Sequence, residues 1–176
     1  MWEKIMTVAV ETGLWQLDAT TSTVGIRHRT MWGLVTVKGG FGAVSGTGEV
    51  RPDGSAVGTL TLDVATLDTG NAKRDTHLKS ADFFDAGHHP EITFAASSAE
   101  LRDGDQVHVV GRLTVRGVTR PLSLRARLKD GDTAGLTLEA EFGVDREQFG
   151  MGWNQLGMIR GRTTVTTTLR FVRATA

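Results

Sequence analysis

The sequence contains no cysteine, carries no net formal charge and has no long apolar run. The absence of cysteine excludes disulfide bonds and thiolate chemistry, although it leaves the cellular compartment open. Twenty basic and twenty acidic side chains balance each other. The total charge therefore gives no electrostatic reason to expect nucleic acid or an anionic membrane surface as a partner. No stretch approaches the roughly 20 apolar residues of a membrane-spanning helix, so we expect no integral membrane segment.

The first residues do not have the pattern of a secretory signal. Their apolar stretch is interrupted by Thr7 and closed by Glu11, and no convincing basic segment precedes it. We therefore expect residues 1–12 to form an N-terminal extension, and we expect the protein to be cytoplasmic. At 176 residues the chain has the length of one domain with a sizeable core, which we place at residues 13–176.

Most of the chain alternates apolar and polar residues in short runs, which is typical of strands with one buried face. The pairs Asp103–Gly104 and Arg116–Gly117 predict tight turns between such strands. About eight one-sided strands with hairpin-length connections favour an antiparallel sheet, and closure of that sheet removes its exposed edges. The predicted fold is all-β, a single antiparallel barrel of about eight strands. The clearest alternating runs are 59–64, 107–115, 122–128 and 136–144.

Residues 34–50 predict a pair of strands with unusually many glycines, at positions 39, 40, 42, 46 and 48. Such a density is incompatible with a straight strand and favours bulges or a sharp bend, as needed where a sheet curls into a barrel. A phosphate-binding glycine loop is disfavoured, because no Gly-Lys-Ser/Thr sequence and no helix follow.

Residues 71–85 break the alternation and predict a short helical insertion. Asn71 is a suitable N-cap, because its side chain accepts a hydrogen bond from a backbone N–H of the first turn. Neither Gly nor Pro occurs in residues 72–79, and Ser80 with Asp82 predicts a second cap. The side chains expected to press onto the core are Leu78, Phe83 and Phe84, and those expected to hold the insertion are Arg74, Asp75 and Asp82.

The insertion also carries a family resemblance. The runs Asp68-Thr69-Gly70-Asn71, Arg74-Asp75-x-His77-Leu78-x-Ser80-x-Asp82-Phe83-Phe84-Asp85 and Pro90-x-Ile92-x-Phe94 resemble the signature of the YceI-like family. The run Gly111-x-Leu113-Thr114-Val115-x-Gly117-Val118-Thr119-x-Pro121 is similar to a second motif of that family. The resemblance implies a lipocalin-like barrel, and several members of the family hold polyisoprenoid or other long amphiphilic chains. It is also compatible with a homodimer.

A barrel of about eight strands is either filled by its own side chains or holds one slender ligand. Small residues expected to face inward, namely Gly25, Ala96, Gly111, Ala126 and Ala140, favour space for a ligand. We therefore predict a non-catalytic carrier, with no required cofactor, that holds a polyisoprenoid or a similar long-chain amphiphile such as an isoprenoid quinone. The predicted wall residues are Ile26, Phe41, Leu60, Leu62, Phe94, Leu113, Leu124, Phe142 and Phe171, with Trp153 and Met158 near the mouth.

Two other functions stay open. One is a filled barrel that serves as a stress-response or interaction module, and the other is an enzyme that acts on a lipid-like or quinone substrate in the cavity. Such an enzyme needs a polar residue inside, and the sequence offers His28. We interpret His28 either as a wall residue with satisfied hydrogen bonds or as a partner for the polar end of a ligand.

The remaining polar clusters predict no catalytic and no metal site. Imidazole and carboxylate are ordinary metal ligands, but the histidines near residue 85 form no helical i, i+4 pair, and His88 and His89 point apart in extended chain. Asp145 and Glu147 are interpreted as turn residues that pair with Arg146, and no Gly-x-Ser-x-Gly elbow is present. Residues 149–159 string apolar side chains over glycine hinges and predict either a lid over a cavity or a plug of the barrel end.

Overall fold

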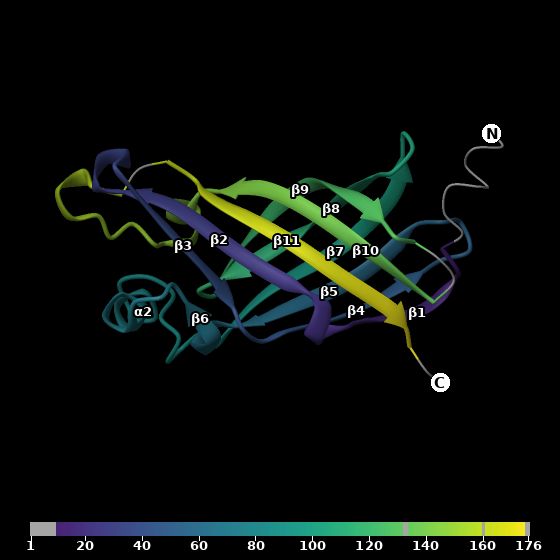
Figure 1. The fold of residues 1–176 in the computed structure, drawn as a ribbon, viewed down its shortest axis with the longest axis horizontal. Helices are drawn as coiled ribbons and strands as arrows, with labels where there is room; N and C mark the ends of the chain where they lie inside the picture. Colours follow the sequence, from purple (N-terminus) through teal and green to yellow (C-terminus); the bar gives the residue numbers. More distant parts are fainter. Residues whose placement is uncertain (1–9, 132–133, 160, 175–176) are drawn as a thin grey trace.

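The computed structural model describes residues 10–131, 134–159 and 161–174 of the chain. In these residues eleven strands form one antiparallel sheet, which closes into a barrel where β1 pairs with β11 (Figure 1). The predicted extension 1–12 lies outside the described residues except for positions 10–12. The strands are β1 (Gly13–Leu17), β2 (Thr23–Thr30), β3 (Val35–Phe41), β4 (Val44–Val50), β5 (Ala56–Asp63), β6 (Leu67–Asp68), β7 (Glu91–Arg102), β8 (Gln106–Val115), β9 (Val118–Lys129), β10 (Gly135–Val144) and β11 (Thr163–Arg173).

Short helical segments interrupt the sheet at its turns. The α-helix α2 (Ala72–Leu78) lies between β6 and β7. Asn71 caps it by accepting a hydrogen bond from the Arg74 N–H at 3.0 Å, as the sequence predicts. The single-turn 3₁₀ segments are η1 (Ala19–Thr21), η2 (Met31–Gly33), η3 (Val64–Thr66), η4 (Arg146–Phe149) and η5 (Gln155–Gly157).

Several consecutive strands are two halves of one bent strand. β1 and β2 pair in turn with the C-terminal and N-terminal halves of β11, and β4 and β3 pair with β1 and β2. In the same way β5 pairs with β4, and the short β6 pairs with β3. Counted in this way, the sheet is a closed antiparallel barrel of eight strands. The all-β barrel with a short helical insertion is therefore confirmed.

The prediction for residues 34–50 is correct in its bend and wrong in its pairing. β3 and β4 do not pair with each other, because the chain bends at Gly42 and continues onward instead of reversing. The glycines serve close packing in addition to the bend. A Cβ atom at Gly39 would lie 2.6 Å from Thr69 Cγ2 and 2.7 Å from the Asp68 carbonyl oxygen, so the segment after β6 needs glycine there.

The barrel has two ends of different construction (Figure 1). The hairpin end carries the β4–β5, β7–β8 and β9–β10 connections together with the start of β1 and the end of β11. The helix end carries the β2–β3 turn, the connection with α2, the β8–β9 turn and residues 145–159. At the β8–β9 turn, Arg116 and Gly117 have φ values of 53° and 72°. These left-handed conformations are those of a two-residue hairpin loop, as the sequence predicts.

The most completely buried side chains lie at the helix end. Val64 and Leu67 are almost fully enclosed, and Phe83, Phe149 and Met151 are buried in the same cluster. The apolar residues of the insertion thus press onto the core as predicted. Between the two ends, the inward faces of the strands leave space, and that space is the candidate site.

Candidate functional site

The barrel encloses a cavity of about 1110 Å³. Its lining comes from the inward faces of all the strands except the two-residue β6. The cavity extends from exposed residues of the hairpin end, such as Gly54 and Gly104, to the exposed Met31 of the helix end. Its volume lies slightly above the roughly 300–1,000 Å³ that is usual for small-molecule pockets.

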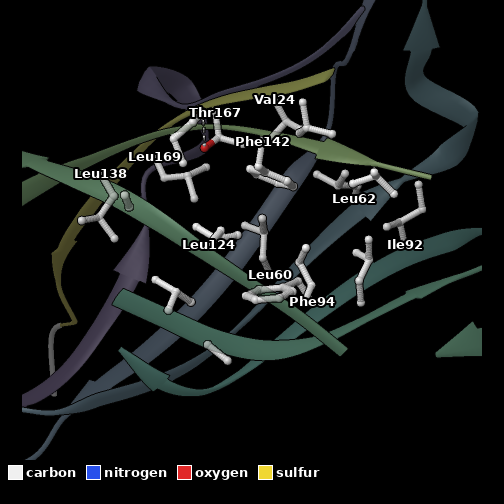
Figure 2. Close-up of a pocket in the computed structure, with 18 of the residues that line it drawn as sticks. Val24, Leu60, Leu62, Ile92, Phe94, Leu124, Leu138, Phe142, Thr167 and Leu169 are labelled. Atoms are coloured by element: carbon white, nitrogen blue, oxygen red, sulfur yellow. Dashed lines mark hydrogen bonds between the residues drawn. The ribbon is translucent and has the colours of Figure 1, made fainter. Parts of the chain in front are cut away.

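The structure brings all of the predicted site residues together around this cavity. Leu60, Leu62, Phe94, Leu124 and Phe142 surround a common space in Figure 2, and they come from the four strands β5, β7, β9 and β10. The complete set of predicted residues in the lining is Ile26, His28, Phe41, Leu60, Leu62, Phe94, Leu113, Leu124, Phe142, Trp153, Met158 and Phe171. Their contact with a ligand remains a prediction.

Three of the five small residues expected to face inward contribute space to the cavity. Ala96, Ala126 and Ala140 line the cavity. Gly25 does not, because it alternates with the inward Val24 and Ile26 and therefore faces outward. Gly111 faces inward, but a Cβ atom there would lie 2.6 Å from Phe94 Cζ, so this glycine makes room for the Phe94 ring instead of for a ligand.

Several lining residues were omitted from the predicted set although the sequence contained a signal for them. Val24, Leu138 and Leu169 lie in the cavity wall (Figure 2) at positions that the period of two already placed on the inward face. Thr167 occupies an inward position of β11 between two apolar residues and is buried. Its hydroxyl lies 3.5 Å from the Ala140 carbonyl oxygen, a long hydrogen bond at best.

His28 forms a polar spot in the cavity wall near the helix end. Its Nδ1 atom lies 2.8 Å from the Thr163 hydroxyl oxygen, and both residues line the cavity. This contact fits the interpretation of His28 as a wall residue with a hydrogen-bond partner. The pair also provides a place where a polar ligand group would lie close to a hydroxyl and an imidazole.

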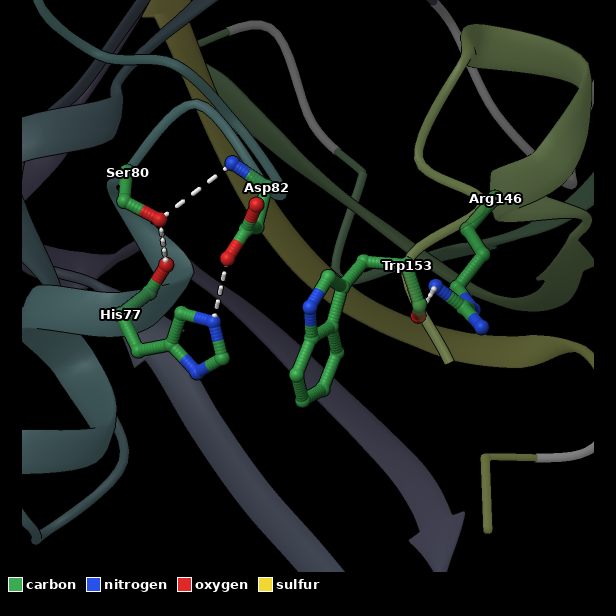
Figure 3. Close-up of polar contacts among 5 residues, drawn as sticks. All are labelled: His77, Ser80, Asp82, Arg146 and Trp153. Carbon is green, nitrogen blue, oxygen red and sulfur yellow. Dashed lines mark hydrogen bonds and ion pairs between the residues drawn. The ribbon is translucent and has the colours of Figure 1, made fainter. Parts of the chain in front are cut away.

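Trp153 closes part of the helix end by packing on the insertion. Its ring centroid is 4.6 Å from that of His77, at an interplanar angle of 85° (Figure 3). It is 5.4 Å from the ring centroid of Phe83, at an interplanar angle of 61°. Such edge-to-face contacts are a favoured geometry of aromatic pairs. His77 Nε2 in turn lies 2.9 Å from Asp82 Oδ2. The ring contacts among His77, Phe83 and Trp153 therefore join residues 145–159 to the insertion.

Arg146 holds the segment that carries Trp153. Its buried guanidinium donates to the carbonyl oxygens of Met151 and, at 2.8 Å, of Trp153 (Figure 3). The sequence-based expectation that Arg146 pairs with its flanking carboxylates is therefore wrong, because the side chain turns inward to the backbone. Burial lowers the pKa of Arg146, while Glu147 and Asp145 act in the opposite direction. An arginine remains charged at ordinary pH.

The residues of the family-like motif fix the insertion to the barrel. The buried Asp75 carboxylate accepts hydrogen bonds from the Thr69 N–H at 3.0 Å and from the Thr69 hydroxyl. Arg74 donates to the Thr69 hydroxyl at 2.8 Å and to the Thr69 carbonyl at 2.7 Å. Burial raises the pKa of Asp75, but the bonds from Thr69, with Lys79 and Arg74, outweigh it, so the pKa lies below its ordinary value. The motif is thus a structural support.

The second cap predicted at Ser80 and Asp82 does not start a helix. Ser80 Oγ donates to the His77 carbonyl at 2.6 Å and accepts a long bond, 3.3 Å, from the Asp82 N–H (Figure 3). The chain from residue 80 to residue 84 forms turns, with Phe83 N–H bonded to the Ser80 carbonyl. Turns suffice here because two aromatic side chains have to reach the core within a few residues.

The histidines of this region occupy separate contacts. His88 Nδ1 lies 3.0 Å from Asp85 Oδ1, whereas His77 contacts Asp82. In residues 10–131, 134–159 and 161–174, no group of three or more His, Cys, Asp or Glu side chains is arranged to hold a metal ion. In the same residues, no helix is long and apolar enough to cross a bilayer.

Known proteins with a similar sequence match parts of the chain. Protein YceI of Escherichia coli O157:H7 is 42% identical over 69 residues, which are 39% of this chain and 36% of that protein. The UPF0312 protein ECA1782 of Pectobacterium atrosepticum is 38% identical over 93 residues, covering 51% of this chain and 47% of that protein. The aligned segments therefore span about a third to a half of these relatives.

Two solved structures share the fold over nearly their whole length. BcnA of Burkholderia cenocepacia superposes with a TM-score of 0.79 at 22% identity, covering 90% of this chain and 99% of BcnA. A polyisoprenoid binding domain from Saccharophagus degradans superposes with a TM-score of 0.72 at 15% identity, covering 91% and 98%. A family model described as the YceI-like domain matches residues 15–171. With this match over nearly the whole barrel, the chain belongs to the YceI-like family.

Proposed function

We propose that this protein is a non-catalytic carrier that holds a polyisoprenoid, or a similar long-chain amphiphile such as an isoprenoid quinone, inside its barrel. The observation that carries the proposal is the cavity of about 1110 Å³ with its largely apolar wall. The description of the Saccharophagus degradans neighbour as a polyisoprenoid binding domain agrees with it.

The energetics of an apolar chain suit such a wall. Burial of one CH₂ group contributes about 0.8 kcal/mol, so a five-carbon isoprenoid unit contributes about 4 kcal/mol. Association costs about 4–15 kcal/mol in lost translational and rotational freedom. A chain of several units is therefore held without a strong polar contact. The polar spot at His28 and Thr163 would then orient one end of the chain instead of supplying the affinity.

The cavity also bears on the two other functions. A filled barrel that serves only as an interaction module is disfavoured, because its inward side chains would occupy the space. An enzyme would need a polar group in the cavity, and the lining offers the polar spot of His28 and Thr163 as well as His77. We expect His28→Ala to leave the amount of retained ligand nearly unchanged and to alter no chemical conversion of it. A chemically changed ligand in the wild type, and an unchanged one in the variant, would favour the enzyme.

The decisive experiment is organic extraction of the gently purified protein followed by mass spectrometry. The expected result is an isoprenoid-like chain in an amount close to one per barrel. The matched comparison is Ala140→Phe, in which a larger side chain partly fills the cavity. An empty extract from the wild type, together with failure to take up an added long-chain isoprenoid, contradicts the carrier.

A further inference from the structure

The helix end projects a tip whose exposed side chains are large and apolar. In the β2–β3 turn, Trp32 is 47% exposed and Leu34 is 85% exposed. Leu156, on the neighbouring η5, is 77% exposed. The two turns lie side by side (Figure 1), and the Trp32 N–H donates to the Met158 carbonyl at 3.1 Å. We define the apolar tip as Met31, Trp32, Leu34, Val35 and Leu156, all of them exposed.

The backbone of the tip holds these side chains in an unfavourable conformation. Met31, Trp32 and Leu156 have φ values of 52°, 55° and 55°. This left-handed region is unusual for bulky side chains. The other described non-glycine residues with positive φ are polar residues of turns, namely Asp85, Asp103, Arg116 and Asp130. The tip therefore exposes large apolar side chains on a strained backbone, and a partner that covers them would bury that apolar surface.

Basic side chains lie next to the tip although the whole chain is neutral. The sequence has no Asp or Glu between Asp18 and Glu49, and none after Glu147. Arg27, Arg29 and Arg162 line one shallow pocket on the outer surface. Arg27 is paired with Glu141 at 2.9 Å. Within the described part of the chain, no carboxylate pairs with Arg29 or Arg162. The local charge thus differs from what the total charge suggested.

We propose that the apolar tip inserts into the interface of an anionic lipid bilayer, with Arg29 and Arg162 against the lipid headgroups. Tryptophan and aliphatic side chains partition into the membrane interface, and arginines close to it are attracted by anionic lipids. A second copy of this chain fits less well. A two-fold contact through the tip would bring the arginines of both copies together.

The position of the tip connects docking to the cavity. Met31 belongs to both the tip and the cavity lining, and Met158, whose carbonyl holds Trp32, lines the cavity as well. A barrel docked in this way places the helix end of its cavity at the bilayer, where an apolar chain would be collected or delivered. This last step rests on the proposed carrier function, whereas docking itself does not.

The test is co-sedimentation of the full chain with vesicles of phosphatidylcholine alone or mixed with phosphatidylglycerol. We expect binding to the anionic vesicles that weakens as salt is added. Trp32→Ser combined with Leu34→Ser should reduce binding by at least about tenfold, since both side chains lose their buried apolar area. Arg29→Gln combined with Arg162→Gln should remove the preference for the anionic vesicles.

The matched control is Leu14→Ser, which removes a 61% exposed leucine at the hairpin end. This variant should bind vesicles like the wild type. Docking is overturned if the tip variant binds as well as the control, if neutral and anionic vesicles bind alike, or if the tip instead drives self-association in gel filtration. Extraction of ligand from the tip variant separates the two proposals. A tip variant that keeps its ligand but no longer docks supports both proposals, whereas a wild type that docks but yields no ligand overturns the carrier alone.

Discussion

At the scale of single residues, the carboxylate of Asp75 is a buried charge that stabilises the fold through hydrogen bonds. It is buried and accepts two hydrogen bonds from Thr69, which position the insertion over the barrel end. The net effect of its surroundings is a pKa below the ordinary value, because the hydrogen bonds outweigh the burial. A depressed pKa in the folded state means that the ionised form stabilises the protein.

We therefore predict a pH-dependent effect of Asp75→Asn. The stabilisation by Asp75 is fully present above its pKa in the unfolded chain and is lost as pH falls through its lowered pKa in the folded state. At pH 7 the variant should lose about 1–3 kcal/mol of unfolding free energy. In urea titrations at pH 7 and pH 3, the difference from the wild type should shrink at the lower pH.

A control for this prediction is the exposed Asp82→Asn, which removes a carboxylate from the same insertion. Its effect on the unfolding free energy should be small, since an exposed contact such as that with His77 contributes little. A difference between Asp75→Asn and the wild type that stays constant over the same pH range would show that the charge of Asp75 is not what stabilises the insertion.

Ala140 tests the cavity as the place of the ligand. It lines the cavity on β10, so Ala140→Phe places a ring in space that is empty of side chains. We expect several-fold less ligand per barrel in organic extracts, with an unfolding free energy changed by no more than about 1–3 kcal/mol. The control is Val110→Phe, which enlarges an outward, exposed residue of β8. Equal ligand content in both variants would place the ligand outside the barrel.

At this scale, the sequence predicts the direction of side chains best in strands that alternate apolar and polar residues. It placed Leu60, Leu124 and Phe142 on the inward face, and they line the cavity. It could not foresee that the inward Gly111 is covered by the ring of Phe94. Periodicity gives the direction of a side chain, whereas the rotamer of a neighbour on the next strand decides whether space remains.

At the scale of elements, residues 149–159 combine the two roles that the sequence left open, namely a lid over the cavity and a plug of the barrel end. Phe149 and Met151 are buried in the core of the helix end, as in a plug, and they line the cavity together with Trp153 and Met158, as in a lid. The outcome depends on Arg146, because its donor groups satisfy two carbonyl oxygens of the loop. The sequence does not show that the Arg146 side chain turns into the protein, because an arginine between Asp145 and Glu147 is equally compatible with an exposed ion pair.

We predict that Arg146→Met loosens this loop. The loss of the guanidinium leaves the carbonyl oxygens of Met151 and Trp153 without their donor, which should cost about 1–3 kcal/mol of unfolding free energy. Because Trp153 packs on His77 and Phe83, its fluorescence should also shift toward that of a solvated indole. The comparison is Arg27→Met, whose guanidinium pairs with Glu141 on the surface. A melting curve and emission spectrum like those of Arg27→Met would contradict this role.

The strands could be predicted from the sequence, but the way in which consecutive strands connect could not. Alternation identified β8, β9 and β10 because each buries one face over many residues. It did not show that β3 and β4 are two halves of one bent strand, because glycines such as Gly42 are compatible with a turn as well as with a bend. The neighbouring strands decide between a turn and a bend. β3 pairs with β2, whereas β4 pairs with β1 and β5, so β3 and β4 follow each other along the sheet and do not form a hairpin.

At the scale of the whole molecule, folding redistributes features that are uniform in the sequence. The chain is neutral in total, yet two segments without carboxylates meet at β2, β3 and β11. The apolar run around Trp32 is visible in the sequence, but its exposure follows from its place at the turn between two strands. The total charge therefore does not describe the local surface, because charges interact mainly within about one Debye length and not as a sum over the chain.

Barrel closure is also uneven, with its weakest seam between β9 and β10. Only three residue pairs, from Arg127 with Glu139 to Lys129 with Thr137, join these strands, whereas β8 with β9 and β10 with β11 each have ten. Beyond Glu139 the facing edges of β9 and β10 lie outside the ladder. Backbone groups there exchange hydrogen bonds with water more easily than groups inside a continuous sheet.

We predict that hydrogen exchange reveals this seam. In residues 119–126 and 140–143, the amides that point across the seam should exchange at least about tenfold faster than the alternate amides that point to β8 or β11. The internal control is β8, which is flanked by β7 and β9 along nearly its whole length and should show no such alternation. The measurement is residue-resolved exchange by NMR under native conditions. Uniform protection across β9 and β10 would mean that the two strands close fully in solution, and the barrel would then have to admit its ligand through an end.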